Sequence, residues 1–155
     1  MLVVRRPASE PYRRVLLAVD ATDTATAATA GTGITPRAEH IIVHVAVVLG
    51  EHLLRLRGIA EDALAKLRHV SLEDVRASIQ RFARELEPQP SRVVIESGVA
   101  RDTLLDLATD HGADLIVVGT GSRTKLSYAL LGSVAAHLMR RAESDVLVVP
   151  ERTGR

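Results

Sequence analysis

Five short apolar runs punctuate the chain, and a longer segment with helical character separates each run from the next. The runs are residues 14–20, 40–48, 92–96, 115–118 and 145–149. Val, Ile and Leu follow one another in them without strict alternation, which is typical of strands buried on both faces of a parallel sheet. Because parallel strands need long crossover connections, this order predicts an α/β fold: a single-domain, doubly wound five-stranded parallel sheet with helices on both faces.

The chain of 155 residues is long enough for one domain with a sizeable core. We expect this domain to occupy residues 12–150, between an N-terminal extension of residues 1–11 and a polar tail of residues 151–155. Apolar side chains recur at helical spacing between the runs. The segment after residue 20 is rich in Ala and Thr, and Gly31 and Gly33 predict that its helix ends early, at about residue 30.

The remaining helices carry clearer signals. Ser71 opens a sequence like a capping box, which indicates that the long segment before Pro88 breaks and restarts as a second helix. His111 followed by Gly112 predicts the C-terminal cap of the next helix, and the last helix is expected over residues 133–141.

Composition excludes several classes of function. The formal net charge is only +1 and there are three aromatic residues, so the chain has neither the basic bias nor the stacking platform of a nucleic-acid-binding protein. It has no cysteine, which excludes disulfides and thiolate chemistry. No apolar run reaches the ~18 residues that a membrane-spanning helix needs, and no signal-peptide pattern opens the chain, so we expect no membrane contact and a cytoplasmic location.

One connection has the form of a phosphate-binding turn. The apolar run that ends at Gly119 leads into small and polar residues, and a new helix begins with Gly132 and Ser133. Backbone N–H groups at a helix N-terminus stabilise anions because they lack intrahelical partners and the helix dipole is positive there. An ordinary strand–loop–helix connection is the alternative.

Taken together, these segments resemble the universal stress protein family over nearly the whole chain, from Tyr12 to Pro150. The resemblance lies in the opening strand that ends at Asp20, the Val-His-Val of residues 43–45, the crossover and strand of residues 98–119, and the ending that runs from residues 130–135 to 145–150. It implies the strand order 3-2-1-4-5, in which the first and fourth strands are neighbours.

The ATP-binding members of that family carry Gly, two residues, Gly, nine residues, then Gly with Ser or Thr. Gly119 fits the first position, and Gly132 with Ser133 fits the last. The second position is Ser122 instead of Gly, and Gly121 lies one place early. Gly permits positive φ and close phosphate approach, whereas a Ser hydroxyl offers a contact to a phosphate oxygen.

The resemblance implies a binding site for ATP, with Mg²⁺ as a possible companion, at the carboxyl ends of the first and fourth strands. Ala18 and Val45 would line the adenine pocket, Val45 through its backbone, and Asp20 would reach the ribose hydroxyls. The phosphates would be surrounded by Gly119, Thr120, Gly121, Ser122 and Arg123, and by the helix-terminal amides of Gly132, Ser133 and Val134. Helix capping is the alternative role for Asp20 and for Ser133.

Catalysis and metal binding find little support in the sequence. There is no strand–turn–helix elbow around a Ser with His and acid partners, and no Walker-type Gly-Lys-Ser motif, so we expect no enzyme, with slow nucleotide hydrolysis left open. His40 and His44 lie on one face of a strand, where a buried hydrogen-bonded pair competes with a metal pair.

Two functions from different classes follow. The first is a small stress-response regulator whose bound nucleotide orders residues 120–131 and so changes the protein surface. The second is a dimeric partner-binding module of the same fold, which has lost nucleotide affinity through Ser122 and a short first helix. The sequence identifies no protein partner.

The last apolar run also predicts a homodimer. In the implied order, residues 145–149 form an edge strand, and an unprotected apolar edge tends to recruit another strand. Pairing with its own copy about a two-fold axis is the simplest closed arrangement. The alternative is a monomer whose edge is covered by residues 1–11.

Overall fold

The computed structural model describes residues 1–5, 7, 10–20, 25–46, 58, 60–120 and 132–150. Its core is one sheet in the order β1-β6-β5-β2-β3-β4. The strands are β1 (Leu2–Val3), β2 (Arg14–Ala18), β3 (Glu39–Ala46), β4 (Arg92–Ser97), β5 (Leu115–Gly119) and β6 (Asp145–Val149). The helices are α1 (Ala25–Ile34), α3 (Glu61–Glu85), α4 (Ala100–Asp110) and α5 (Ser133–Arg141).

The expected five-stranded, all-parallel sheet is wrong, because the sheet has six strands and mixed direction. β2 to β6 run parallel to their neighbours, whereas β1 pairs antiparallel with β6, with Leu2 opposite Leu147 and Val3 opposite Val146. Residues 145–149 are therefore not an edge strand, which removes the premise of the predicted dimer. The extension covers that edge instead, and a strand of two residues is too short to show a period in the sequence.

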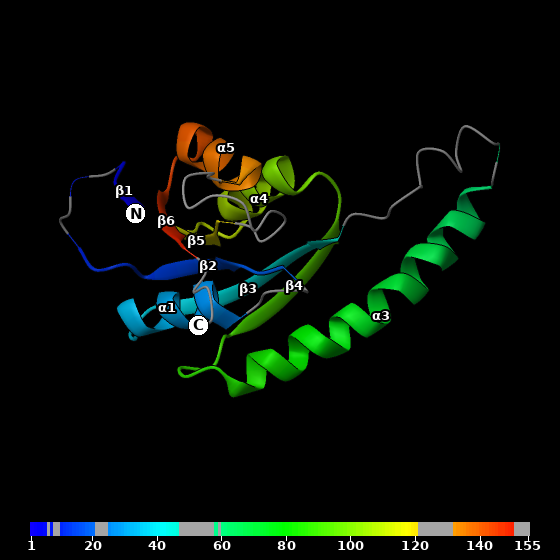
Figure 1. The fold of residues 1–155 in the computed structure, drawn as a ribbon, viewed down its shortest axis with the longest axis horizontal. Helices are drawn as coiled ribbons and strands as arrows, with labels where there is room; N and C mark the ends of the chain where they lie inside the picture. Colours follow the sequence, from blue (N-terminus) through cyan, green and yellow to red (C-terminus); the bar gives the residue numbers. More distant parts are fainter. Residues whose placement is uncertain are drawn as a thin grey trace.

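The sheet is buried on both faces by separate pairs of helices (Figure 1). α4 and α5 cover one face, where Leu104, Ala108, Ala135 and Leu138 pack on the sheet. α1 and α3 cover the other, with Ala27, Ala28, Ile79 and Ala83 in its core. The central strand β2 contributes Leu16 to the first core and Val15 and Leu17 to the second. This two-sided burial explains why its sequence is apolar without alternation.

α1 does not end before Gly31, as the sequence suggested, but continues to Ile34. Gly31 belongs to the packing of the helix on the sheet. A Cβ there would lie 2.7 Å from Leu17 Cδ2 and 3.1 Å from Val117 Cγ2. The missing side chain lets the helix approach the two central strands closely, so packing outweighs the low helix propensity of Gly.

α3 also differs from expectation, because it runs unbroken through Ser71 over 25 residues. The capping-box pattern there does not start a new helix. The C-terminus of α4 is confirmed: His111 is the cap residue, Gly112 adopts a φ of +59°, and the amide of Ala113 donates to the carbonyl oxygen of Ala108 at 2.8 Å. None of the helices described combines the length and apolar character needed to cross a membrane.

Gly31 and Gly33 form a matched pair for testing the packing of α1. We expect Gly31→Ala to lower the free energy of unfolding by about 1–3 kcal/mol, because the new methyl group meets a full core. Gly33→Ala should raise it by up to about 1 kcal/mol through helix propensity, since nothing lies within 4 Å of a Cβ at that position. Urea unfolding of both variants measures the difference. Equal effects would show that propensity alone governs this helix.

Candidate functional site

The predicted site residues on three neighbouring strands reach the same edge of the sheet. Ala18 of β2 lies in register with Val43 of β3 and Val118 of β5. Asp20, Val45 and Thr120 each follow two residues later along parallel chains. The amide of Val19 donates to the carbonyl oxygen of Val43 at 2.9 Å, so β2 and β3 stay attached beyond the last residue of β2. The carboxyl edge therefore brings these side chains together.

The winding of the sheet reverses between β2 and β5. α1, the helix that follows β2, covers one face of the sheet, whereas α5, the helix that follows β5, covers the opposite face (Figure 1). The connections diverge at this point, and open α/β sheets bind their ligands in a crevice expected there, outside the carboxyl ends of the two strands.

A backbone hydrogen bond fixes the start of α5 at this crevice. The amide of Gly132 donates to the carbonyl oxygen of Thr120 at 3.0 Å. The amide of Thr120 donates in turn to the carbonyl oxygen of Val149 at 3.1 Å, which anchors it to β6. The N-terminus of α5 therefore lies directly beside the carboxyl end of β5.

The start of α5 has the character of an anion-binding helix end. Gly132 is the cap residue, no side chain caps the helix, and its first turn holds no acid. The capping role considered for Ser133 is wrong, because Ser133 is the first helical residue and is exposed. Basic residues lie only in the last turn, at Arg140 and Arg141, so they reinforce the dipole of the helix.

Gly119 leaves its backbone accessible at the crevice. Among the described residues, a Cβ at this position would meet only the Cβ of Ala27, at 3.8 Å, which is an ordinary van der Waals contact. Close packing on the described residues therefore does not explain the glycine at this position, whereas it does explain Gly31. Close approach of a ligand to the backbone would explain it.

The other predicted site residues divide into three groups. Ala18, Val45 and Val134 are partly buried and pack against the core on the α4 and α5 face, so they form an apolar wall near the crevice. Asp20 is exposed. Gly121, Ser122 and Arg123 lie outside the described residues, and their predicted roles stay predictions.

The sequence did not anticipate a polar pair between the two helices on this face. His137 of α5 lies with its Nε2 3.5 Å from Asp102 Oδ1 in the first turn of α4. His137 and Ser133 are four residues apart and so share one face of α5. Residues separated by 35 positions show no local spacing signal, so only the packing of the two helices reveals the pair.

His40 and His44 are both buried on the face that α1 and α3 cover, and each has a protein partner. His40 Nε2 lies 2.9 Å from Thr35 Oγ1, and His44 Nδ1 lies 2.9 Å from the carbonyl oxygen of Val19. The described residues contain no group of three metal-ligating side chains. These contacts favour the hydrogen-bonded pair over the metal pair.

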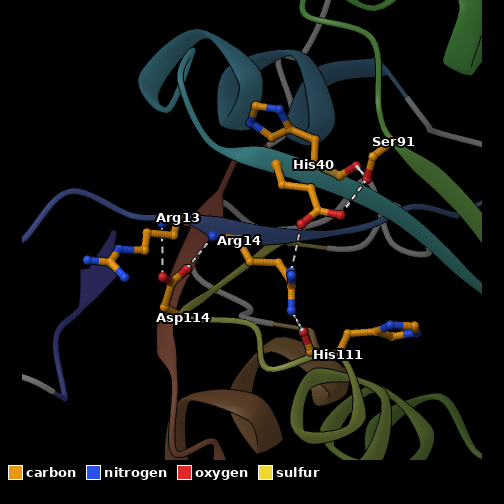
Figure 2. A network of polar contacts seen from close by, with 7 residues as sticks. Arg13, Arg14, His40, Ser91, His111 and Asp114 are labelled. Carbon is orange, nitrogen blue, oxygen red and sulfur yellow. Dashed lines mark hydrogen bonds and ion pairs between the residues drawn. The ribbon is translucent and has the colours of Figure 1, made fainter.

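The opposite, amino edge of the sheet is held by charged side chains (Figure 2). The carboxylate of Asp114 accepts hydrogen bonds from the amides of Arg13 at 2.9 Å and Arg14 at 3.0 Å. Arg14 Nε donates to Glu39 at 2.8 Å, and the other Glu39 oxygen accepts from Ser91 at 2.9 Å.

These contacts join β2, β3 and the start of β5. The hydrogen bond from Arg14, followed by that from Ser91, lowers the pKa of Glu39 below its usual value. Both Glu39 oxygens and both Asp114 oxygens have protein donors, so we regard this network as structural.

The strand order and the helices on both faces define an open, doubly wound α/β domain. The chain matches the model of the Universal stress protein family over residues 11–150. The chain therefore belongs to the universal stress protein family.

Relatives carry the same family name. Universal stress protein G of Escherichia coli O157:H7 is 31% identical over 112 residues, which are 70% of this chain and 77% of the relative. Universal stress protein MJ0577 of Methanocaldococcus jannaschii is 28% identical over 94 residues, 59% of this chain and 58% of the relative. Universal stress protein Rv1636 of Mycobacterium tuberculosis is 46% identical over 52 residues, 34% and 36% of the two chains. The last two matches thus span less than two thirds of the relatives' length.

Solved structures share the fold. The structure of MJ0577 superposes with a TM-score of 0.67 at 23% identity and covers 92% of this chain and 99% of that one. A universal stress protein in complex with cAMP superposes with a TM-score of 0.53 at 24% identity, covering 90% and 98%.

The buried His40 makes stability depend on pH. Burial lowers the pKa of His40 below 6.5, and the contact with Thr35 opposes this only in part. The neutral His40 ring contributes fully to folding stability above about pH 6.5, the pKa of His in an unfolded chain. This contribution is lost as the pH falls, because the unfolded chain then binds a proton that the buried ring resists. We expect unfolding free energy to fall more steeply below that pH in the parent than in His40→Gln. Parallel pH profiles would contradict this.

Proposed function

We propose that this protein binds ATP or a related adenine nucleotide in the crevice at the carboxyl ends of β2 and β5. The observation that carries the proposal is the hydrogen bond from the Gly132 amide to Thr120, which holds the N-terminus of α5 against the end of β5. Phosphate groups bind favourably at such a helix end because of its free amides and its positive dipole.

The adenine and ribose would lie toward β2 and β3. Ala18 and Val45 pack against the core at the edge of the crevice and offer an apolar wall to the base, with Val45 also contributing backbone groups. Asp20 would accept hydrogen bonds from the ribose hydroxyls. Its exposed position two residues beyond Ala18 supports this role.

The phosphates would lie between β5 and α5. Gly119 and Thr120 would approach from the strand, and Gly132, Ser133 and Val134 from the first turn of the helix. Gly121, Ser122 and Arg123 follow directly after Thr120 and would complete the phosphate contacts, with Arg123 supplying a cation. The open backbone at Gly119 and the absence of acids from the first turn of α5 both support an anionic group here.

Mg²⁺ fits this site only as a companion of the nucleotide. It is usually held by one or two carboxylates together with phosphates and water. Of the described residues at the crevice, Asp20 supplies a carboxylate, and no group of three metal-ligating side chains is present among the residues described. When bound, Mg²⁺ would neutralise phosphate charge, while the protein's own groups position the nucleotide.

The function would come from binding and not from turnover. Bound nucleotide would order residues 120–131 and so alter the surface offered to other proteins. The cAMP complex of a structurally similar universal stress protein supports an adenine nucleotide as the ligand class. A stress-response regulator that reads adenine nucleotides is therefore the function we propose.

The rival function is a partner-binding module of the same fold without nucleotide affinity. One of the two arguments for this rival function was that the first helix is short, but α1 extends to Ile34. The other is Ser122, whose effect can be measured directly. Calorimetric titration with ATP separates the two functions.

Replacing Gly132 tests the phosphate site. Its φ of −56° and ψ of 149° suit any L-residue, so Gly132→Val should keep the fold. The β-branched side chain would block close approach to the first amides of α5, and we expect ATP binding to be lost in calorimetry. Gly33→Val, at an open position of α1, is the matched control and should bind like the parent. Unchanged affinity in Gly132→Val would remove the start of α5 from the site.

Restoring glycine at position 122 tests the departure from the family motif. We expect Ser122→Gly to bind ATP modestly more tightly, because backbone freedom at a phosphate turn matters more than one neutral hydroxyl group. Titration of parent and variant under the same conditions gives the ratio of affinities. Weaker binding by the variant would mean that the Ser122 hydroxyl contacts the phosphate.

A further inference from the structure

β4 forms the border of the sheet opposite β1. It is the last strand in the order, and none of the described strands pairs with its outer side, whereas β1 covers the other border at β6 (Figure 1). We propose that β4 is a docking site for an extended segment of a partner protein. The segment adds to the sheet as an antiparallel strand and places two consecutive acidic residues against Arg84 and Arg92. The proposal does not depend on the nucleotide site, because it rests on the outer border of the sheet.

The outer side of β4 offers backbone hydrogen-bonding groups. The amide of Gly98 donates to the carbonyl oxygen of Ala46 at 3.2 Å, so it points toward β3. Backbone groups alternate in direction along a strand, so those of Val93, Ile95 and Ser97 point away from β3. These are the groups that an added strand would use.

The centre of β4 is apolar and only partly covered. Val93, Val94 and Ile95 are all partly buried, Val93 and Ile95 against the core under α1 and α3, and Val94 against the core under α4 and α5. Between Arg92 and Glu96 there is neither a proline nor a charge, the features by which edge strands usually avoid pairing. β4 is therefore an edge that another strand can join.

A basic hollow lies where this edge begins. It measures about 280 Å³, and Gln80 and Arg84 line it from α3, with Gln89, Ser91 and Arg92 on the other side. None of the residues that line it is acidic. Among the hydrogen bonds and ion pairs of the described residues, none involves the guanidinium of Arg84 or of Arg92. Both guanidinium groups are therefore able to bind carboxylates from outside.

The side chains of β4 specify the charges of the added strand. Arg92 and Glu96 lie on the same face as Val94, because side chains alternate along a strand. Antiparallel pairing is slightly more stable per residue than parallel pairing. In an antiparallel pair, an acid opposite Arg92 and a base opposite Glu96 form two favourable cross-strand pairs. The matching sequence, from its N-terminus, is a basic residue, any residue, an apolar residue, any residue and an acidic residue.

The hollow adds a second acid to this pattern. The residue after the acid opposite Arg92 points to the other face of the sheet, which α3 covers and where Arg84 lines the hollow. β4 of a second copy also carries a base and an acid four residues apart, but Ser97 follows its Glu96. A second copy would therefore leave Arg84 without a carboxylate, whereas a segment with two consecutive acids occupies both guanidinium groups. This charge complementarity favours an acidic partner segment.

A short peptide with this pattern is the probe. The acetylated hexapeptide Lys-Thr-Val-Thr-Glu-Glu carries a fluorescent label, and anisotropy at about 0.15 M salt measures its affinity. We expect the parent to bind it, and Arg84→Gln or Arg92→Gln to weaken binding roughly two- to five-fold, the effect of one exposed ion pair. Arg81→Gln, on the same helix but outside the hollow, is the matched control and should bind like the parent.

Exchanging the charges makes the test specific. The double variant Arg84→Glu with Arg92→Glu should lose affinity for the acidic probe and bind Lys-Thr-Val-Thr-Lys-Lys, which the parent should not bind. Both side chains are exposed, so the variant should keep the fold.

Methylated probes test whether the peptide adds as a strand. The Thr residues at its second and fourth positions would lie opposite Ile95 and Val93 and donate their amides to β4, whereas the amides of the third and fifth positions point away. N-methylation of both Thr amides should abolish binding, and N-methylation of the third and fifth amides should leave it unchanged. The bound probe should also slow deuterium exchange at the amides of Val93 and Ile95.

Each other result overturns the proposal. Failure of the parent to bind the probe, or equal affinity for the reversed sequence Glu-Glu-Thr-Val-Thr-Lys, would show that β4 does not select this strand. Equal affinity of Arg84→Gln and the parent would remove the hollow from the site. If both doubly methylated probes bind alike, the peptide does not extend the sheet. If the amides of Val93 and Ile95 become protected without probe as the protein concentration rises, a second copy occupies the edge.

Discussion

The pairing of β2 with β5 is the interaction on which the rest of this molecule depends. These two strands come from opposite halves of the chain, and their register, with Val15 beside Leu115 and Ala18 beside Val118, fixes both halves relative to one another. Because the strands are covered on both faces, the helices that follow them must leave in opposite directions. The binding site that we propose lies where these connections diverge.

The two ends of this central pair have different chemistry. At the amino edge, the carboxylates of Asp114 and Glu39 use both of their oxygens on protein donors from Arg13, Arg14 and Ser91. At the carboxyl edge, Gly119 and the uncapped start of α5 present backbone groups instead. Fixed charges stabilise one end of the sheet, and the other end is left able to accept an anionic ligand. This asymmetry is the reason that we propose the binding site at the carboxyl edge.

The sequence predicts the features of this structure that depend on residues close together along the chain. It misses features that depend on residues far apart along the chain. The five parallel strands and the cap at His111 and Gly112 follow from local patterns. The phosphate site that the family motif predicts at Gly119 and Gly132 stays a prediction. β1 was missed as a strand because two residues carry no period, and its partner β6 lies more than 140 positions away.

Gly31 was misread for a similar reason. A glycine that ends a helix and a glycine that allows close packing cannot be told apart from the sequence alone. The closeness of this position to Leu17 and Val117 in the structure distinguishes them. The pair of His137 and Asp102 likewise required the packing of α4 on α5.

The measurement that tests the central claim most directly is hydrogen–deuterium exchange of the parent protein with and without saturating ATP. Binding in the crevice predicts slower exchange at the carboxyl end of β5, residues 118–120, and in the first turn of α5, residues 132–136. Exchange in β1 and at the amino edge around Arg14 and Glu39 should be unchanged. Absence of any protection at millimolar ATP, or protection confined to other segments, would contradict the account.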